Sequence, residues 1–291
     1  MDILHYQKDF IDYLESKKWI NEPKNLYEPI DYIIKLGGKR IRPVLTLMAA
    51  DIFSGGYEKA MPAALAVEVF HNFTLIHDDI MDDAPLRRGE ETVHEKWDIN
   101  TGILSGDAML ILAYQYFENY EPIVFQKLAK LFSKTALEVC DGQQLDVDFE
   151  TRNDVTINEY IDMIRLKTSV LVAAALKMGA IVAETTEENA NLIYDFGLNL
   201  GLAVQLQDDY LDAFGNPDTF GKQVGGDIIE NKKTFLYLKS LEVANQEDQN
   251  KLHFYYNQKL DDNSIKIAEV TRIFKSNEIP LLIKEEIKNY T

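Results

Sequence analysis

The chain has 291 residues, a formal net charge of −18, 46% hydrophobic residues and one cysteine. This apolar content is enough for a sizeable globular core, and the negative charge disfavours nucleic acid and anionic membrane surfaces as partners. The longest apolar run, Val170 to Ala175, is too short to span a bilayer. The N-terminal residues lack the basic and apolar blocks of a signal peptide. We therefore expect a soluble protein with no membrane span.

The single cysteine, Cys140, excludes a disulfide within the chain and a thiolate metal cluster. It lies in an apolar helical stretch, so we expect it to be buried and structural. A reducing compartment, the cytoplasm, fits this cysteine usage.

Apolar residues recur every three or four positions through most of the chain, which is the spacing of helices. Alternating β-branched runs bounded by hairpin turns are absent, and no segment has the composition of an interdomain linker. The pattern predicts an all-α fold with a central bundle, in one domain over residues 1–291. The predicted helices span residues 61–80, 106–116, 125–149, 157–183 and 189–214, and residues 245–262 are expected to be a polar helix or loop.

Basic residues form several clusters in this acidic chain. The first, Gly37-Gly38-Lys39-Arg40-Ile41-Arg42-Pro43, is expected to open a helix, and others follow at Arg87-Arg88-Gly89, Lys167-Thr168, Lys222 and Lys232-Lys233. Any one of them alone is typical of surface charge. Together, near carboxylates, they favour an anion held directly by cations, and arginine is suited to bidentate contact with phosphate.

Two segments repeat a D-D-x-x-D spacing. They are His77-Asp78-Asp79-Ile80-Met81-Asp82-Asp83 and Gln207-Asp208-Asp209-Tyr210-Leu211-Asp212, and each follows an apolar helical run. On a helix, residues i and i+4 share a face, so such carboxylates lie close together and repel one another. A cation would neutralise them.

Clusters that offer only oxygen ligands suit hard cations such as Mg²⁺, which binds one or two carboxylates together with water and substrate phosphate. One acidic helix end alone is more often a solvated surface. Two such clusters, each ending an apolar helix, favour a pair of metal-binding faces that bracket a diphosphate.

Taken together, these segments resemble the trans-isoprenyl diphosphate synthases, a family also called the polyprenyl synthetases. The resemblance covers about residues 35 to 236, in the family's order. It rests on GGKRIRP, HDDIMDDAPLRRG, LKT, QLQDDYLDAFG and GKQVGGDIIENKKT.

The resemblance implies an all-α homodimer, an isoprenoid-synthase-type helical bundle with a central active-site cavity. Three Mg²⁺ ions are implied, two held by Asp78 and Asp82 and a third by Asp208. The catalytic residues that the resemblance implies are Asp78, Asp79, Asp82, Arg87, Lys167, Thr168, Gln205, Asp208 and Lys222. Asp209 and Asp212 complete the second motif. Arg87, Lys167 and Lys222 would contact the allylic diphosphate. Lys39, Arg42, His71 and Arg88 would bind isopentenyl diphosphate, and Lys232 is a further substrate-binding position.

The reaction that the resemblance implies is a head-to-tail condensation of isopentenyl diphosphate with dimethylallyl, geranyl or farnesyl diphosphate. Metal ions and basic residues stabilise the departing diphosphate, and the isopentenyl double bond attacks the allylic cation. Thr168 and Gln205 match positions whose oxygens face that cation. Val204 replaces an aromatic residue of many relatives. Residues 214–226 are rich in glycine, and they are either a loop that closes over the diphosphate or an ordinary connection.

Product length is expected to depend on residues beneath the first aspartate motif. Phe73 and Thr74 lie roughly 6–8 Å along the helix from Asp78. In this family one bulky residue at the first position accompanies geranylgeranyl diphosphate (C20), so Phe73 with the small Thr74 favours that product. Farnesyl diphosphate (C15) is the alternative, and Phe70 is either a deeper floor or a core aromatic.

Three other classes were weighed. A terpene cyclase would lack the second diphosphate pocket, and a metal phosphohydrolase would leave the second aspartate cluster and the arginine pair unexplained. A non-catalytic regulatory subunit of a prenyl synthase would have lost one aspartate cluster, whereas both are intact here.

Overall fold

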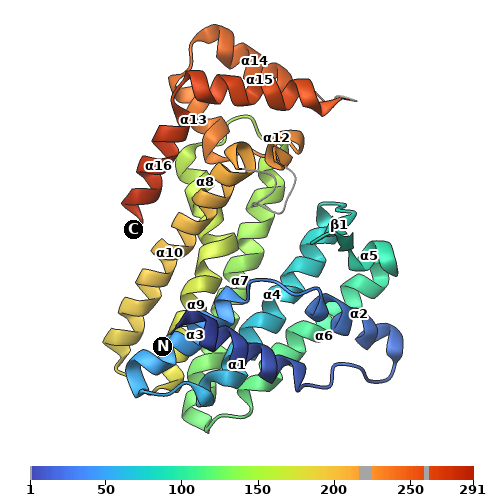
Figure 1. Ribbon diagram of the computed structural model, residues 1–291, viewed down its shortest axis with the longest axis vertical. Helices are drawn as coiled ribbons and strands as arrows, with labels where there is room; N and C mark the ends of the chain where they lie inside the picture. Colours follow the sequence, from blue (N-terminus) through green and yellow to red (C-terminus); the bar gives the residue numbers. More distant parts are fainter. Residues whose placement is uncertain (1, 216–223, 259–261) are drawn as a thin grey trace. The chain divides into compact units, whose positions relative to one another are not determined.

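The computed structural model describes residues 2–215, 224–258 and 262–291, and regular structure there is helical apart from one short hairpin. The all-α fold class is confirmed (Figure 1). No helix in these ranges is both long and apolar enough for a membrane crossing. In chain order the elements are α1 (Ile3–Glu15), α2 (Lys24–Lys35), α3 (Ile41–Ser54), a 3₁₀ turn (Glu58–Ala60), α4 (Met61–Met81), β1 (Leu86–Arg87), β2 (Glu90–Glu91), α5 (Val93–Lys96), α6 (Ile99–Phe117), α7 (Pro122–Thr151), α8 (Ile157–Ile164), a π-helical turn (Arg165–Ser169), α9 (Val170–Val182), α10 (Glu187–Phe214), α12 (Gly226–Ile229), α13 (Phe235–Val243), α14 (Gln246–Tyr256), α15 (Asn263–Ser276) and α16 (Ile279–Asn289).

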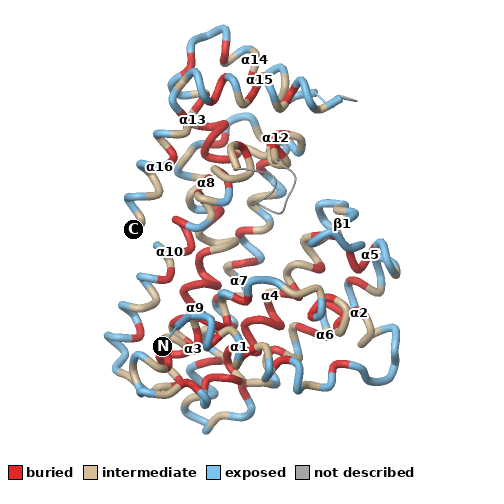
Figure 2. The backbone as a smooth tube through the Cα atoms, in the orientation of Figure 1, coloured by how far each residue is buried: buried red, intermediate tan, exposed pale blue. Residues whose placement is uncertain are grey.

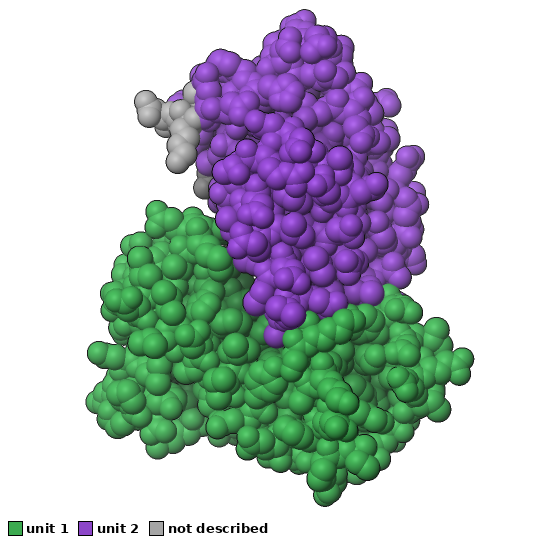
Figure 3. Space-filling view, turned by 180° about the vertical axis from the view of Figure 1, so that it is seen from behind, with its two compact units in different colours: residues 1–135, 171–195 green, residues 136–170, 196–291 purple. Residues whose placement is uncertain are grey.

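The chain forms two compact units, which Figure 3 colours separately. Unit 1 consists of residues 1–135 and 171–195, and unit 2 of residues 136–170 and 196–291. The prediction of one domain over residues 1–291 is not decided by this division and stays a prediction.

Helix α4 is the core of unit 1. Every residue from Ala63 to Phe70 is buried, and a helix buried on all sides belongs in a domain interior (Figure 2). Helices α3 and α6 pack against it. Phe132 joins the core through edge-to-face contacts, with its ring 4.9 Å from that of Phe70 and 5.2 Å from that of Phe117. Phe70 is therefore a core aromatic.

The core of unit 2 is built by α8, the second half of α10, and α13 to α16. Leu206, Leu252 and Ile273 are fully buried in it, and the rings of Tyr237 and Tyr256 stack at 3.9 Å. These helices keep their apolar faces together at the three-to-four residue spacing of an amphipathic helix.

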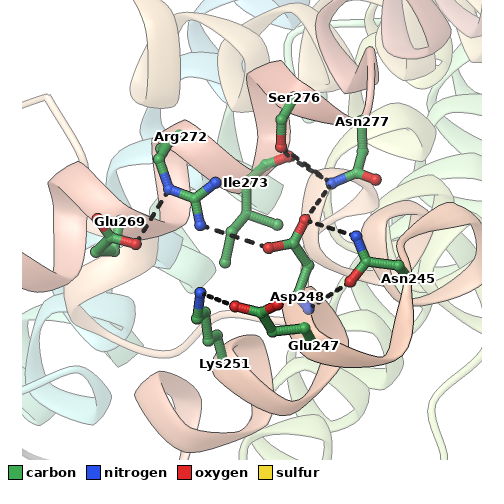
Figure 4. Close-up of polar contacts among 9 residues, drawn as sticks. All are labelled: Asn245, Glu247, Asp248, Lys251, Glu269, Arg272, Ile273, Ser276 and Asn277. Carbon is green, nitrogen blue, oxygen red and sulfur yellow. Dashed lines mark hydrogen bonds and ion pairs between the residues drawn. The ribbon is translucent and has the colours of Figure 1, made fainter.

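A buried carboxylate ties α14 to α15 (Figure 4). Asp248, which is 8% exposed, accepts hydrogen bonds from Arg272 at 3.4 Å and from Asn277 at 3.2 Å. Asn245 caps α14 by accepting from the Asp248 N–H at 3.0 Å. A buried charge needs such partners, because it is otherwise costly to remove from water.

The fold departs from the sequence analysis at three points. Residues 157–183, predicted as one helix, are interrupted by the π-helical turn at Arg165–Ser169. Residues Leu86–Glu91 form a small hairpin, with positive φ at both Arg88 and Gly89. The prediction that Cys140 is buried is wrong: the residue is exposed, because α7 turns the neighbouring Val139 toward the core instead.

The π-helical turn lies directly against α7 at Gly142. A Cβ added to Gly142 would lie 2.2 Å from the backbone nitrogen of Lys167 and 2.7 Å from the carbonyl carbon of Leu166. Both are backbone atoms, so they cannot move aside without displacing the turn itself.

We expect Gly142→Ala to destabilise the protein by about 1–3 kcal/mol, the usual cost of overpacking. The measurement is urea unfolding followed by circular dichroism. Gly56→Ala is the matched control, because its Cβ meets only the flexible carboxylate end of Glu58, at 3.2 Å. That control should stay within about 0.5 kcal/mol of the unmodified chain. Equal stabilities for all three proteins would contradict the close approach.

Candidate active site

The first aspartate motif ends α4. Asp78 lies in the last turn, with 22% of its side chain exposed. Asp82 is the C-cap, and its backbone N–H donates to the Asp78 carbonyl at 2.9 Å. The predicted i, i+4 placement of these two residues agrees with the helix. The C-terminal end of a helix carries the negative end of its dipole, so it disfavours further anions. Two carboxylates there favour a bound cation.

Asp79, between them, points inward and is 2% exposed. Arg87 of β1 donates to it through two of its guanidinium nitrogens, with Nε 2.7 Å from Oδ2 and Nη2 2.6 Å from Oδ1. Burial raises the pKa of Asp79, and the hydrogen bonds from Arg87 oppose that rise. Asp79 therefore anchors Arg87, whose Nη2 also lies 3.9 Å from Oδ2 of Asp78. Asp78 is partly buried and Asp82 is exposed, so both are more accessible than Asp79.

The residues predicted to bind isopentenyl diphosphate all lie in unit 1. Arg42 of α3 contacts His71 of α4, with Nη1 3.1 Å from Nε2. A guanidinium can only donate, so Nε2 of His71 accepts. Burial, followed by the neighbouring Arg42, Arg88, Arg87 and Arg40, holds the pKa of His71 well below its usual value. His71 is thus a neutral partner within a group of cations.

Arg88 and Lys39 complete this group. Arg88 occupies the turn of the hairpin and donates to the Gly37 carbonyl of the Gly37–Arg40 segment. Lys39 is exposed on that segment. Burial and repulsion by Arg40 and Arg87 lower the pKa of Arg88. Such a concentration of like charges is stabilised when an anion binds among them.

The second aspartate motif lies near the end of α10 and repeats the arrangement of the first. Asp208 is exposed, whereas Asp209 is 3% exposed. Tyr160 donates to Oδ2 of Asp209, and Gln205 Nε2 donates to Oδ1 at 3.1 Å. Burial raises the pKa of Asp209 to about 7. Asp212, one turn after Asp208, accepts a hydrogen bond from the Asp227 N–H at 3.1 Å.

The π-helical turn presents the predicted Lys167 and Thr168. Lys167 Nζ lies 2.6 Å from Oδ2 of Asp146 on α7. Thr168 Oγ1 donates to Gln205 Oε1 at 3.1 Å, so Thr168, Gln205 and Asp209 form one hydrogen-bonded series within unit 2. Turns of this kind often occur at functional sites, because they redirect side chains within a helix.

Two predicted residues need separate mention. Lys222, with most of the predicted closing loop, lies outside the described residues. Lys232 forms an ion pair with Glu230 at 2.9 Å. Its neighbour Lys233 donates to the carbonyls of Phe149 and Glu150, at 2.6 and 2.9 Å, near the end of α7.

Of the residues expected to influence product length, Phe73 is 9% exposed, and its ring lies 5.4 Å from that of Phe70 and 4.8 Å from that of His77. Thr74 is partly buried and donates to the His71 carbonyl at 2.8 Å. Phe73 therefore lies between the aromatic core and the end of α4 that carries Asp78 and Asp82.

Sequence reasoning missed several residues of the site. Asp146 forms an ion pair with Lys167, and Tyr160 donates a hydrogen bond to Asp209. Of the two, only Asp146 could have been noticed in the sequence, as an acidic residue in the middle of a predicted helix. Asp83, His94 and Glu95 also lie together, with ligand atoms within 4.8 Å of one another. Both ring nitrogens of His94 are buried there without a hydrogen bond.

The donor set of the two motifs fits magnesium. Asp78, Asp82 and Asp208 offer carboxylate oxygens at accessible helix ends, and hard cations prefer such ligands. The buried Asp79 and Asp209 are already engaged by Arg87, Tyr160 and Gln205.

Comparison with known proteins identifies the family. The model of the polyprenyl synthetases matches residues 23–273. A geranylgeranyl diphosphate synthase of Methanosarcina mazei is 41% identical over 225 residues, covering 77% of this chain and 69% of that protein. A geranylfarnesyl diphosphate synthase of Natronomonas pharaonis is 39% identical over 237 residues, covering 75% and 70%.

A solved structure extends the similarity to the whole fold. The crystal structure of a geranylgeranyl pyrophosphate synthase superimposes with a TM-score of 0.95 at 55% identity, covering 100% of this chain and 90% of that one. With the family model spanning residues 23–273, these similarities establish that the chain belongs to the polyprenyl synthetase family.

Proposed function

We propose that this protein condenses isopentenyl diphosphate head-to-tail with an allylic diphosphate and releases inorganic diphosphate. One observation carries the proposal: unit 1 holds two different anion-binding arrangements. Asp78 and Asp82 suit a diphosphate bound through metal ions, whereas Lys39, Arg42 and Arg88 suit one bound directly. A terpene cyclase or a phosphohydrolase has no use for the second arrangement, because it binds one phosphorylated substrate.

Asp78, Asp82 and Asp208 would hold Mg²⁺, three ions per site by analogy with the family. Mg²⁺ held there would supply positive charge to the departing diphosphate. Arg87, fixed by Asp79, and Lys167, fixed by Asp146, add positive charge to the same group. Lys222 and Lys232 are further candidates for this contact.

The remaining residues orient the second substrate and the cation. Lys39, Arg42 and Arg88 hold isopentenyl diphosphate, and the neutral His71 accepts from Arg42 and so fixes its guanidinium. The oxygens of Thr168 and Gln205 face the allylic cation. The released diphosphate accepts the proton, so the reaction needs no side chain as base. Val204, next to Gln205, is 48% exposed, and it is the position where the chain departs from the aromatic residue of many relatives.

Geranylgeranyl diphosphate is the proposed product. The named relatives include synthases of both geranylgeranyl and geranylfarnesyl diphosphate at nearly equal identity, so identity alone does not decide chain length. Phe73 supports the shorter product, because it is the bulky side chain that lies beneath Asp78 on α4. Farnesyl diphosphate is the alternative product.

The working form is proposed to be a homodimer that acts in the cytoplasm. Each chain is proposed to be one domain that includes both compact units. Helix α6 supports the dimer, since it presents Leu104 and Ile111 at 60% and 58% exposure on one face, two turns apart. Ile103 is a further exposed apolar residue, at 40%. Apolar side chains grouped in this way usually mark an interface.

A product assay tests the reaction. We expect the purified protein with Mg²⁺, isopentenyl diphosphate and dimethylallyl, geranyl or farnesyl diphosphate to yield a linear prenyl diphosphate, and a chelator to abolish it. Asp78→Asn and Asp208→Asn should each lower kcat/KM by about 10²–10³-fold or more. Asp141→Asn, which removes an exposed carboxylate on α7, is the matched control and should remain active. A folded protein that condenses no primer would favour a regulatory subunit that needs a partner.

Product length can be tested at Phe73. Phe73→Ala should lengthen the main product by at least one five-carbon unit, because it opens space beneath the metal site. Phe73→Leu, which keeps more of the core packing, should shift the distribution less. Phe254→Ala, at a residue that is 52% exposed, should leave it unchanged. Chromatography of the dephosphorylated products measures all three, and an unaltered distribution in Phe73→Ala would refute the assignment.

The third prediction concerns assembly. Leu104→Glu combined with Ile111→Glu should halve the mass measured by light scattering, because it places charges in the proposed interface. Leu281→Glu, at a residue that is 58% exposed on α16, should leave the mass unchanged. A monomeric unmodified chain, or a dimer in the double variant, would overturn the proposed interface.

A further inference from the structure

The segment Gly37–Arg40, which carries Lys39 and leads into Arg42, has an unusual backbone. Gly37, Gly38 and Arg40 have φ values of 81°, 126° and 50°. Glycine adopts these conformations readily, but a residue with a Cβ does so at a steric cost. The conformation of Arg40 therefore persists only because its surroundings impose it.

Arg40 differs from the other cations of the group, because its side chain points into unit 1 and is 4% exposed. Its guanidinium donates through Nη2 to the carbonyl of Ile34, in the last turn of α2. Through Nη1 it donates to the carboxylate of Glu68 in the middle of α4. Arg40 thus joins the end of α2, the segment and α4.

Glu68 is itself held in place. It is 2% exposed, and Asn72, one turn later on α4, donates through Nδ2 to the Glu68 carbonyl at 2.8 Å and to its Oε1 at 3.0 Å. With α4 buried around it, the carboxylate has a fixed position. It does not reach the exposed side of the segment, so it cannot touch a bound diphosphate.

Two more side chains hold the outer side of the same segment. Gln7 of α1 donates to the Lys39 carbonyl at 3.0 Å, and Arg88 donates to the Gly37 carbonyl. A Cβ on Gly38 would lie 2.8 Å from Nη2 of Arg88. The guanidinium of Arg88 therefore rests directly on the segment, and its own position depends on the backbone conformation there.

We propose that Glu68 and Arg40 are a buried positioning pair, which sets the placement of Lys39, Arg42 and Arg88 for isopentenyl diphosphate. The proposal rests on the proposed function and adds two residues to it that do not contact substrate. A purely structural role is the competing explanation. The two roles can be separated, because replacing both members of a buried ion pair by apolar residues of similar size often preserves or increases stability.

The decisive variant is Arg40→Met combined with Glu68→Met. It leaves no unpaired buried charge, so it should unfold at a temperature close to that of the unmodified chain. It removes the hydrogen bond from Arg40 to the Ile34 carbonyl, so the segment that carries Lys39 is no longer held in place. The KM for isopentenyl diphosphate should therefore rise by about 10- to 100-fold. The KM for the allylic diphosphate should stay within about twofold, because Asp79 and Arg87 are untouched.

A second ion pair supplies the control. Arg152 and Glu159 of unit 2 lie 2.8 Å apart and are only partly buried. Arg152→Met combined with Glu159→Met should leave both KM values unchanged. Glu68→Gln keeps an oxygen that can accept from Arg40 and Asn72, although it leaves the Arg40 charge without its counter-charge. It should therefore retain more of the isopentenyl diphosphate affinity than the apolar double variant. Equal KM values in the apolar variant and the unmodified chain would overturn the positioning role.

Calorimetry separates this proposal from the proposed reaction. Isopentenyl diphosphate is titrated into each protein with Mg²⁺ and saturating inorganic diphosphate, which stands in for the allylic substrate. Weaker binding by the apolar variant alone supports the pair, whatever the turnover. Equal binding refutes the pair but leaves the reaction intact. If the unmodified chain neither binds nor condenses isopentenyl diphosphate, both proposals are wrong.

Discussion

Repulsion between neighbouring carboxylates is the constraint on which both aspartate motifs are built. Each motif stands at or near the C-terminal end of a long helix, where the helix dipole adds to the repulsion. In each, the second aspartate turns inward and is held by the protein: Asp79 forms an ion pair with Arg87, and Asp209 accepts hydrogen bonds from Tyr160 and Gln205. The outer carboxylates Asp78, Asp82 and Asp208 are more exposed than the inner ones. In the proposed function, a cation bound there would relieve the repulsion that the internal contacts leave.

The cationic residues show the same arrangement with the charges reversed: one buried, paired charge lies beside more accessible charges of the same sign. Arg40 is withdrawn into unit 1 and paired with Glu68, whereas Lys39 and Arg88 are exposed and Arg42 is partly buried beside His71. Mutual repulsion among these cations is relieved by an anion. In the proposed function, each binding group thus combines a buried, hydrogen-bonded member that would fix geometry with more accessible members that would hold the ligand.

Much of this arrangement could be predicted from the sequence, because periodicity and motif spacing are local properties. Helices α4, α7 and α10 and the accessible aspartates follow from them. The π-helical turn could not be predicted, since Arg165–Ser169 contains no proline or glycine that would mark a change of hydrogen bonding within the predicted helix. Tyr160 and Glu68 were missed because their partners are distant in sequence. Cys140 was misplaced because an apolar stretch does not by itself reveal which residue of the turn faces inward.

Helix α4 carries Glu68, His71, Phe73 and Asp78 on a single uninterrupted segment that is buried on nearly all sides. In the proposed reaction, a single helix therefore fixes the distance between Asp78, at the reacting end, and Phe73, which limits the product. The point where chain growth starts and the point where it stops cannot move independently, since no hinge or loop lies between them. In the proposed reaction, movements of the surrounding helices would therefore leave the separation between Phe73 and Asp78 unchanged.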